Sequence, residues 1–144
     1  MNTKVNTKIY KSVYSLAEQL LDADQRGDQV AFDAHYAVLK AICINNENTD
    51  KDHPEQWETL ADFTASFDEA ILGYEKALTK ATAINAKDHM ASIAFSMAML
   101  QIELGQTDAA IRNLQNAKIS ANKSDDKELK AEIDAMLAQQ LAAQ

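Results

Sequence analysis

The side chains best suited to chemistry are spread thinly along this chain of 144 residues. The three histidines, His35, His53 and His89, form no HExxH or i,i+4 pair, so no two of them share a helix face as metal ligands. A zinc site needs three or four converging ligands, and these spacings do not indicate convergence. We therefore predict no metal site and no cofactor, and a site assembled from separate hairpins stays the less favoured alternative.

A calcium loop is the next arrangement to test, because Asp50 and Asp52 stand two residues apart in a polar stretch. An EF-hand loop requires a glycine at its sharp turn and a bidentate glutamate at its end. Glu55 and Ala61 occupy those two places. The stretch is therefore predicted to be an ordinary polar loop.

Nucleophilic catalysis is not indicated either. The single cysteine, Cys43, lies eight residues from His35, about two turns along one predicted helix and too far for a nucleophile–base hydrogen bond. Its neighbours Ile42 and Ile44 indicate a buried core residue rather than a reactive thiol. Three scattered glycines provide no phosphate-binding loop. We expect a protein that is not an enzyme.

Charge and composition narrow the choice of partner. The formal net charge is −8, whereas a nucleic-acid surface needs clustered lysine and arginine, so we expect no DNA or RNA binding. No stretch is apolar over the 18 or so residues of a membrane span, and the first eleven residues do not resemble a signal peptide. We expect a soluble, bacterial-type protein of the cytoplasm that does not bind membranes.

The elements that must position these side chains are helices throughout. One proline, three glycines and many Ala, Leu, Gln and charged residues favour helix, and apolar residues recur at spacings of three and four. The prediction is an all-α single domain over residues 1–144 with about seven helices. Short loops make neighbouring helices antiparallel, which gives three hairpins and a capping helix. Their approximate ranges are 7–45, 54–86 and 88–123 for the hairpins and 125–143 for the last helix.

Local signals mark several helix ends and one close contact. Asp28 and Asp88 are predicted N-caps, and Ser66 with Glu69 matches the capping box. Gly73 lies inside a predicted helix, where it costs about 1 kcal/mol relative to alanine. We interpret Gly73 as a point where two helix backbones approach closely.

The hairpins resemble tetratricopeptide repeats (TPR). In the clearest unit, the residues at the family's Trp, Leu, Gly and Tyr places are Ala94, Met97, Ala98 and Gln101, and those at its Ala, aromatic and Ala places are Ala110, Leu114 and Ala117. The preceding unit carries Ala70, Tyr74 and Ala77 at the same second-helix spacing, after Trp57, Leu60 and Ala61 in its first helix. The chain departs from the family at the terminal proline, where Asn122 stands. The resemblance covers residues 54–124 and extends weakly over the first 45.

This resemblance implies a short right-handed solenoid, with a groove lined by the first helix of each hairpin. In residues 88–104 it places Phe95, Met99 and Ile102 as apolar groove residues for a partner segment, and plain packing between helices is the alternative. The first helix of the preceding unit adds Thr59, Asp62 and Phe63 to the predicted partner-binding residues. One subclass of the family grips a C-terminal carboxylate with Lys and Asn; Phe95 and Met99 stand at those places here, so that clamp is missing.

The function predicted from the sequence is a non-catalytic protein–protein interaction module that binds a partner protein or peptide through a helical groove. The alternative is an acidic helical inhibitor or nucleic-acid mimic that acts on a basic partner through the acidic surface between Asp50 and Glu69. An uncovered apolar edge would allow a homo-oligomer.

Overall fold

Seven α-helices make up the computed structural model, which describes residues 7–144. No strand occurs among these residues, so the all-α prediction is confirmed. The helices are α1 (Thr7–Arg26), α2 (Gln29–Asn46), α3 (Pro54–Asp62), α4 (Phe67–Ala83), α5 (Lys87–Glu103), α6 (Thr107–Ala121) and α7 (Lys127–Ala142). None of them is both long and apolar enough to cross a bilayer.

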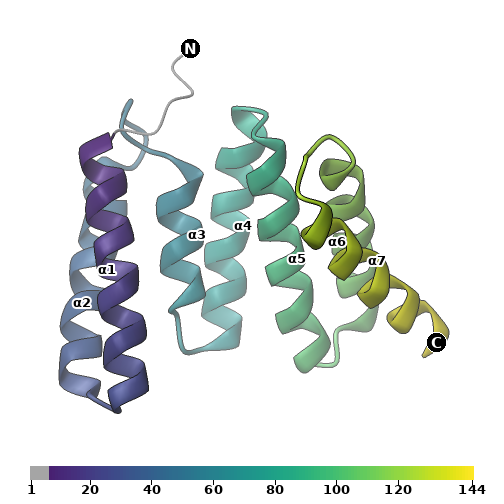
Figure 1. The fold of residues 1–144 in the computed structure, drawn as a ribbon, viewed down its shortest axis with the longest axis horizontal. Helices are drawn as coiled ribbons and strands as arrows, with labels where there is room; N and C mark the ends of the chain where they lie inside the picture. Colours follow the sequence, from purple (N-terminus) through teal and green to yellow (C-terminus); the bar gives the residue numbers. More distant parts are fainter. Residues whose placement is uncertain (1–6) are drawn as a thin grey trace.

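The hairpins stand side by side in the order of the chain, from α1 and α2 at one end to α6 and α7 at the other (Figure 1). Successive helices are antiparallel and pack as hairpins α1–α2, α3–α4 and α5–α6, and α7 packs on α6. The first helices of the hairpins, α1, α3 and α5, also contact one another in turn. One side of the row is therefore built from the first helices alone, as stacked hairpins require.

Side-chain caps begin two of these helices, α2 and α4, where the sequence predicts them. Asp28 accepts a hydrogen bond of 3.0 Å from the Ala31 N–H, and Ser66 accepts one of 3.4 Å from the Glu69 N–H. Gly27 ends α1 with a φ of +68°, a conformation that glycine adopts without steric cost. The prediction for Asp88 is wrong: α5 begins at Lys87, so Asp88 lies in its first turn and favours the helix dipole without capping it.

The larger core joins α1 to α5. Leu20, Leu39 and Cys43 are fully buried in it. The predicted core position of Cys43 is therefore confirmed, and burial raises the pKa of its thiol to about 12. Val30, in the first turn of α2, is 82% exposed.

Gly73 is the point of closest approach between α3 and α4. A β-carbon built on Gly73 would lie 3.2 Å from the Ala61 β-carbon, tighter than ordinary van der Waals contact. The predicted close approach is therefore present, and it needs small residues on both helices.

The last helix, α7, covers the end of the row through one residue above all. Ile133 is fully buried in a cluster of alanines contributed by α5 and α6, namely Ala91, Ala94, Ala117 and Ala121. The apolar side chains of α7 are only partly covered, since Leu141 remains 48% exposed. The small residues leave room for Ile133, so α7 docks by inserting a large side chain between short ones.

Candidate functional site

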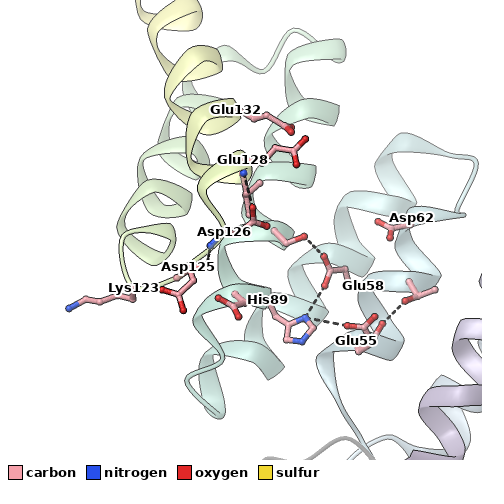
Figure 2. A pocket seen from close by; sticks show the side chains of 14 residues that line it. Glu55, Glu58, Asp62, His89, Lys123, Asp125, Asp126, Glu128 and Glu132 are labelled. Atoms are coloured by element: carbon pink, nitrogen blue, oxygen red, sulfur yellow. Dashed lines mark hydrogen bonds and ion pairs between the residues drawn. The ribbon is translucent and has the colours of Figure 1, made fainter.

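A concave groove of about 770 Å³ lies between α3, α5 and the start of α7. We call it the acidic groove, because its lining holds eight carboxylates: Glu55, Glu58, Asp62, Asp88, Asp125, Asp126, Glu128 and Glu132. The groove lining also includes Lys123 and His89 as its basic side chains. Figure 2 shows the carboxylates of α3 facing those of the α6–α7 turn and α7 across the opening.

Several of these carboxylates have a local reason to be where they are. Glu55, Asp88 and Glu128 lie in the first turns of α3, α5 and α7, where a negative charge offsets the positive end of the helix dipole. This preference for a carboxylate in the first turn is local to each helix. Stacking brings the three starts to one end of the molecule, so the local preferences add up to a single negative surface.

Glu58 and His89 are in direct contact in the acidic groove. His89 Nδ1 lies 3.2 Å from Glu58 Oε1 and 3.5 Å from Glu55 Oε2. The Ser92 hydroxyl donates a hydrogen bond of 2.6 Å to Glu58 Oε2. The hydrogen bond to Glu58 and the nearby carboxylates raise the pKa of His89, whereas burial raises the pKa of Glu55.

His53 sits directly behind this contact. Its ring lies edge-on to that of His89 at 5.3 Å between centroids, and its Nδ1 accepts a hydrogen bond from the Glu55 N–H, which caps α3. Burial and the neighbouring His89 charge lower the pKa of His53 to about 4. The pKa values of these two adjacent rings are thus shifted in opposite directions, down for His53 and up for His89. His89 is therefore protonated more readily than His53.

Asp62 lies at the other end of the groove lining, as the last residue of α3. Tyr74 Oη donates a hydrogen bond of 2.6 Å to Asp62 Oδ1. The Asp62 side chain is solvent-exposed, yet incomplete hydration in the concave surface raises its pKa to about 6 against the lowering effect of Tyr74.

The six partner-binding residues predicted from the sequence fall in different places. Thr59 and Asp62 line the acidic groove. Phe63 does not line it; this side chain packs against the larger core and meets Phe32 edge-on at 6.4 Å.

Phe95 and Ile102 lie against α7 and α6. Phe95 contacts both clusters under α7, and Ile102 packs in the cluster of Leu114 with side chains of α7. Met99 is half-buried and does not line the acidic groove. Packing between helices, the alternative interpretation of this stripe, accounts for Phe95 and Ile102. A partner-binding role for the three residues stays a prediction.

The cluster of Glu55, Glu58 and His89 was missed by sequence reasoning. One ligand atom from each of the three lies within 4.8 Å of the others, close enough to hold a metal ion. A signal for it exists: His53 and His89 each stand at the start of the first helix of a hairpin, and equivalent places in successive hairpins lie side by side. His53 and His89 belong to different hairpins, and the stacking of α3 on α5 brings their rings together.

Comparison with known proteins supports the fold of this chain and nothing beyond the fold. No protein-family profile and no curated protein matches the chain. Two solved structures are similar to it. One is PcrH in complex with the chaperone binding region of PopD, with a TM-score of 0.62, 21% identity, and 99% of this chain and 98% of that chain covered. The other is PcrH from Pseudomonas aeruginosa, with a TM-score of 0.58, 20% identity, and coverage of 91% and 92%. The similarity spans the whole row of hairpins.

Proposed function

We propose that this protein is a non-catalytic binding module that holds a lysine- or arginine-bearing segment of a partner protein in the acidic groove. The observation that carries the proposal is the convergence of eight carboxylates on one concave surface. A groove lined by one sign of charge raises the local concentration of opposite charges and speeds their association.

The size and position of the groove support a segment as the ligand. Its volume of about 770 Å³ is within the 300–1,000 Å³ usual for ligand sites, and it opens along the side built from first helices. PcrH, which has a similar fold, was crystallised with the chaperone binding region of PopD. We infer that this chain uses the same kind of fold to bind a protein segment, with charge as the selecting feature.

The hydroxyl nearest the histidine supports a binding role over catalysis. Ser92 donates its hydrogen bond to the Glu58 carboxylate and not to the His89 ring. A serine nucleophile needs a base that accepts its proton while its oxygen faces the substrate, commonly a histidine. Here the Glu58–Ser92 contact instead fixes a side chain of the groove lining.

The alternative function is an acidic inhibitor or nucleic-acid mimic. It would also bind a basic partner, but it requires a different shape of the acidic surface. A mimic presents its charges on a surface that enters the partner's site. In this protein the carboxylates of α3 and α7 face one another across a hollow (Figure 2), which suits a basic segment entering the groove. We therefore favour the groove. The cytoplasmic location, the family assignment and self-association stay predictions.

Fluorescence anisotropy with labelled short peptides tests the proposal. Lysine-rich, glutamate-rich and apolar peptides of equal length are titrated with the full chain at low and high salt. We expect the lysine-rich peptide to bind and its affinity to fall as salt rises, because ionic screening weakens exposed charge pairs. Preferential binding of the apolar peptide, unaffected by salt, would overturn the proposal.

A charge-reversal pair provides the matched control. Glu128→Lys with Glu132→Lys replaces two exposed carboxylates of the groove lining. Glu18→Lys with Asp33→Lys makes the same change in net charge on exposed positions of α1 and α2. The groove variant should lose the lysine-rich peptide and the control should keep it. Equal losses would mean that net charge alone attracts the peptide.

A further inference from the structure

We propose that Glu55, Glu58 and His89 form a binding site for one zinc ion in the lining of the acidic groove. The inference rests on the geometry of these three side chains and is independent of the partner proposed above. It assigns the groove a metal ligand set of one imidazole nitrogen and two carboxylate oxygens, which zinc accepts in proteins.

The ligand spacing matches a tetrahedral ion. Zinc bonds to histidine nitrogen and carboxylate oxygen are about 2.0–2.2 Å long, so two ligands of one tetrahedral ion lie roughly 3.3–3.5 Å apart. His89 Nδ1 lies 3.2 Å from Glu58 Oε1 and 3.5 Å from Glu55 Oε2. The three atoms all lie within 4.8 Å of one another, so small rotations about the glutamate side chains complete the set.

Rigid elements hold the ligands in place. Glu55 and Glu58 stand three residues apart on α3 and thus on one helix face, and His89 is supplied by the first turn of α5. Ser92 fixes one oxygen of Glu58 through its 2.6 Å hydrogen bond and leaves the other toward His89. The edge-on ring of His53 supports the imidazole from behind. Hydrogen bonds that orient ligands in this way strengthen metal binding.

The charge balance also favours a cation here. Within residues 7–144, Glu55 and Glu58 form ion pairs with His89 alone, and the Glu58 side chain is only 12% exposed. A carboxylate this deep needs a compensating charge, and a doubly charged ion supplies more of it than one imidazolium. Histidine ligates zinc in its neutral form, so His89 would bind the ion through the Nδ1 atom that faces Glu58 Oε1.

Zinc is favoured over calcium and magnesium by the donor set. Calcium takes six to eight oxygen ligands and magnesium prefers six in an octahedron, whereas this site has three donors, one of them nitrogen. The fourth position of a tetrahedral zinc ion would face the groove and take water or a side chain of a bound segment.

Isothermal titration calorimetry of the chelator-treated full chain with ZnCl₂ tests the site. We expect one zinc ion per chain and a rise in melting temperature with zinc, because a ligand that binds only the folded state stabilises it. Loss of a hydrogen bond to a metal ligand lowers metal affinity roughly 10–100-fold. His89→Gln removes a ligand itself, so it should weaken zinc binding by more than this. Ser92→Ala, which removes only that hydrogen bond, should fall within this range.

His35→Gln is the matched control, because His35 lies on α2, away from the site, and should bind zinc as the unchanged protein does. Melting curves without metal establish that each variant folds. Three results would overturn the proposal: no zinc binding by the unchanged protein, unchanged affinity in His89→Gln, or equal affinity for Ca²⁺ or Mg²⁺. Binding of Co²⁺ with the visible spectrum of a tetrahedral ion would support the geometry directly.

Discussion

Tyr74 ties α4 to the end of α3 through its 2.6 Å hydrogen bond to Asp62. The acceptor is a carboxylate at the C-terminus of a helix, where the helix dipole disfavours negative charge. The two effects oppose each other: the phenol favours the charged form of Asp62, and incomplete hydration disfavours it more, which leaves a pKa of about 6.

Replacing Asp62 by Asn should stabilise the protein at neutral pH. A carboxyl whose pKa is higher in the folded state than in the unfolded state binds more protons when folded, so its contribution to stability grows as pH falls from about 7 toward 4. Asp62→Asn should therefore raise the free energy of unfolding at pH 7.5 and lose part of this advantage at pH 5, where the carboxyl is mostly protonated in the folded state but still ionised in the unfolded state. The gain stays within about 1 kcal/mol because Asp62 is exposed. Urea unfolding at the two pH values, with a chelator present, measures it, and a difference independent of pH would contradict the argument.

Removing the phenol should push the Asp62 pKa further up. Tyr74→Phe deletes a hydrogen bond that favours the carboxylate, while incomplete hydration in the concave surface continues to disfavour it. We expect a higher Asp62 pKa and a loss of about 1–3 kcal/mol, as for a hydrogen bond to a charged group. Carbon-13 NMR titration of the carboxyl follows the pKa. An unchanged pKa would show that Tyr74 does not interact with Asp62 in solution.

Gly73 should tolerate alanine but not valine. Alanine places its β-carbon 3.2 Å from Ala61, and this crowding is offset by about 1 kcal/mol of better helix propensity. Valine adds two methyl groups at the same contact, so Gly73→Val should cost roughly 1–3 kcal/mol. Leu72→Val, on an exposed position of the same helix, is the control and should change little. Thermal melts that rank the two valine variants equally would show that α3 and α4 are not in close contact there.

Helix positions could be predicted from the sequence because their signals are local. Asp28 and Ser66 act within a few residues of the helix starts they specify, and the structure shows both as N-caps. Asp88 shows how far such local signals reach. An aspartate at the N-cap and an aspartate in the first turn look the same in the sequence, and Asp88 lies two residues after the N-cap position, Ala86.

The acidic groove could not be predicted in the same way, because its residues meet only through stacking. Glu58 and His89 are separated by 31 residues and belong to different hairpins. Apolar residues lie on two sides of the predicted helix of residues 88–104. The sequence does not say which side faces a groove and which packs against a neighbouring helix. In the structure α7 covers Phe95 and Ile102, and polar side chains face the groove.

Ile133 should contribute most of the binding energy between α7 and the rest of the fold. It is fully buried among alanines that cannot move to fill a gap, so Ile133→Ala should cost about 2–5 kcal/mol. Leu141→Ala, at a 48% exposed position of the same helix, should stay within about 0.5 kcal/mol. Thermal melts distinguish the two, and truncation before Ser124 should lower the melting temperature further and cause aggregation. Equal effects of the two alanine variants would show that α7 does not dock as described.

Met97 and Met99 provide a direct test of which side of α5 is core. Met97 is 3% exposed within the larger core, whereas Met99 is half-buried. Met97→Glu should unfold the protein, because a buried unpaired carboxylate is costly, and Met99→Glu should melt close to the unchanged protein, because its charge can reach water.

Peptide binding then decides whether Met99 has a role beyond packing. If the acidic groove alone selects the partner, Met99→Glu should keep the lysine-rich peptide, since Met99 does not line the groove and the added carboxylate does not repel a basic ligand. Loss of that peptide with an unchanged melting curve would instead place the apolar stripe of Phe95, Met99 and Ile102 in the binding surface. Large and equal losses of stability at Met97 and Met99 would show that both belong to the core.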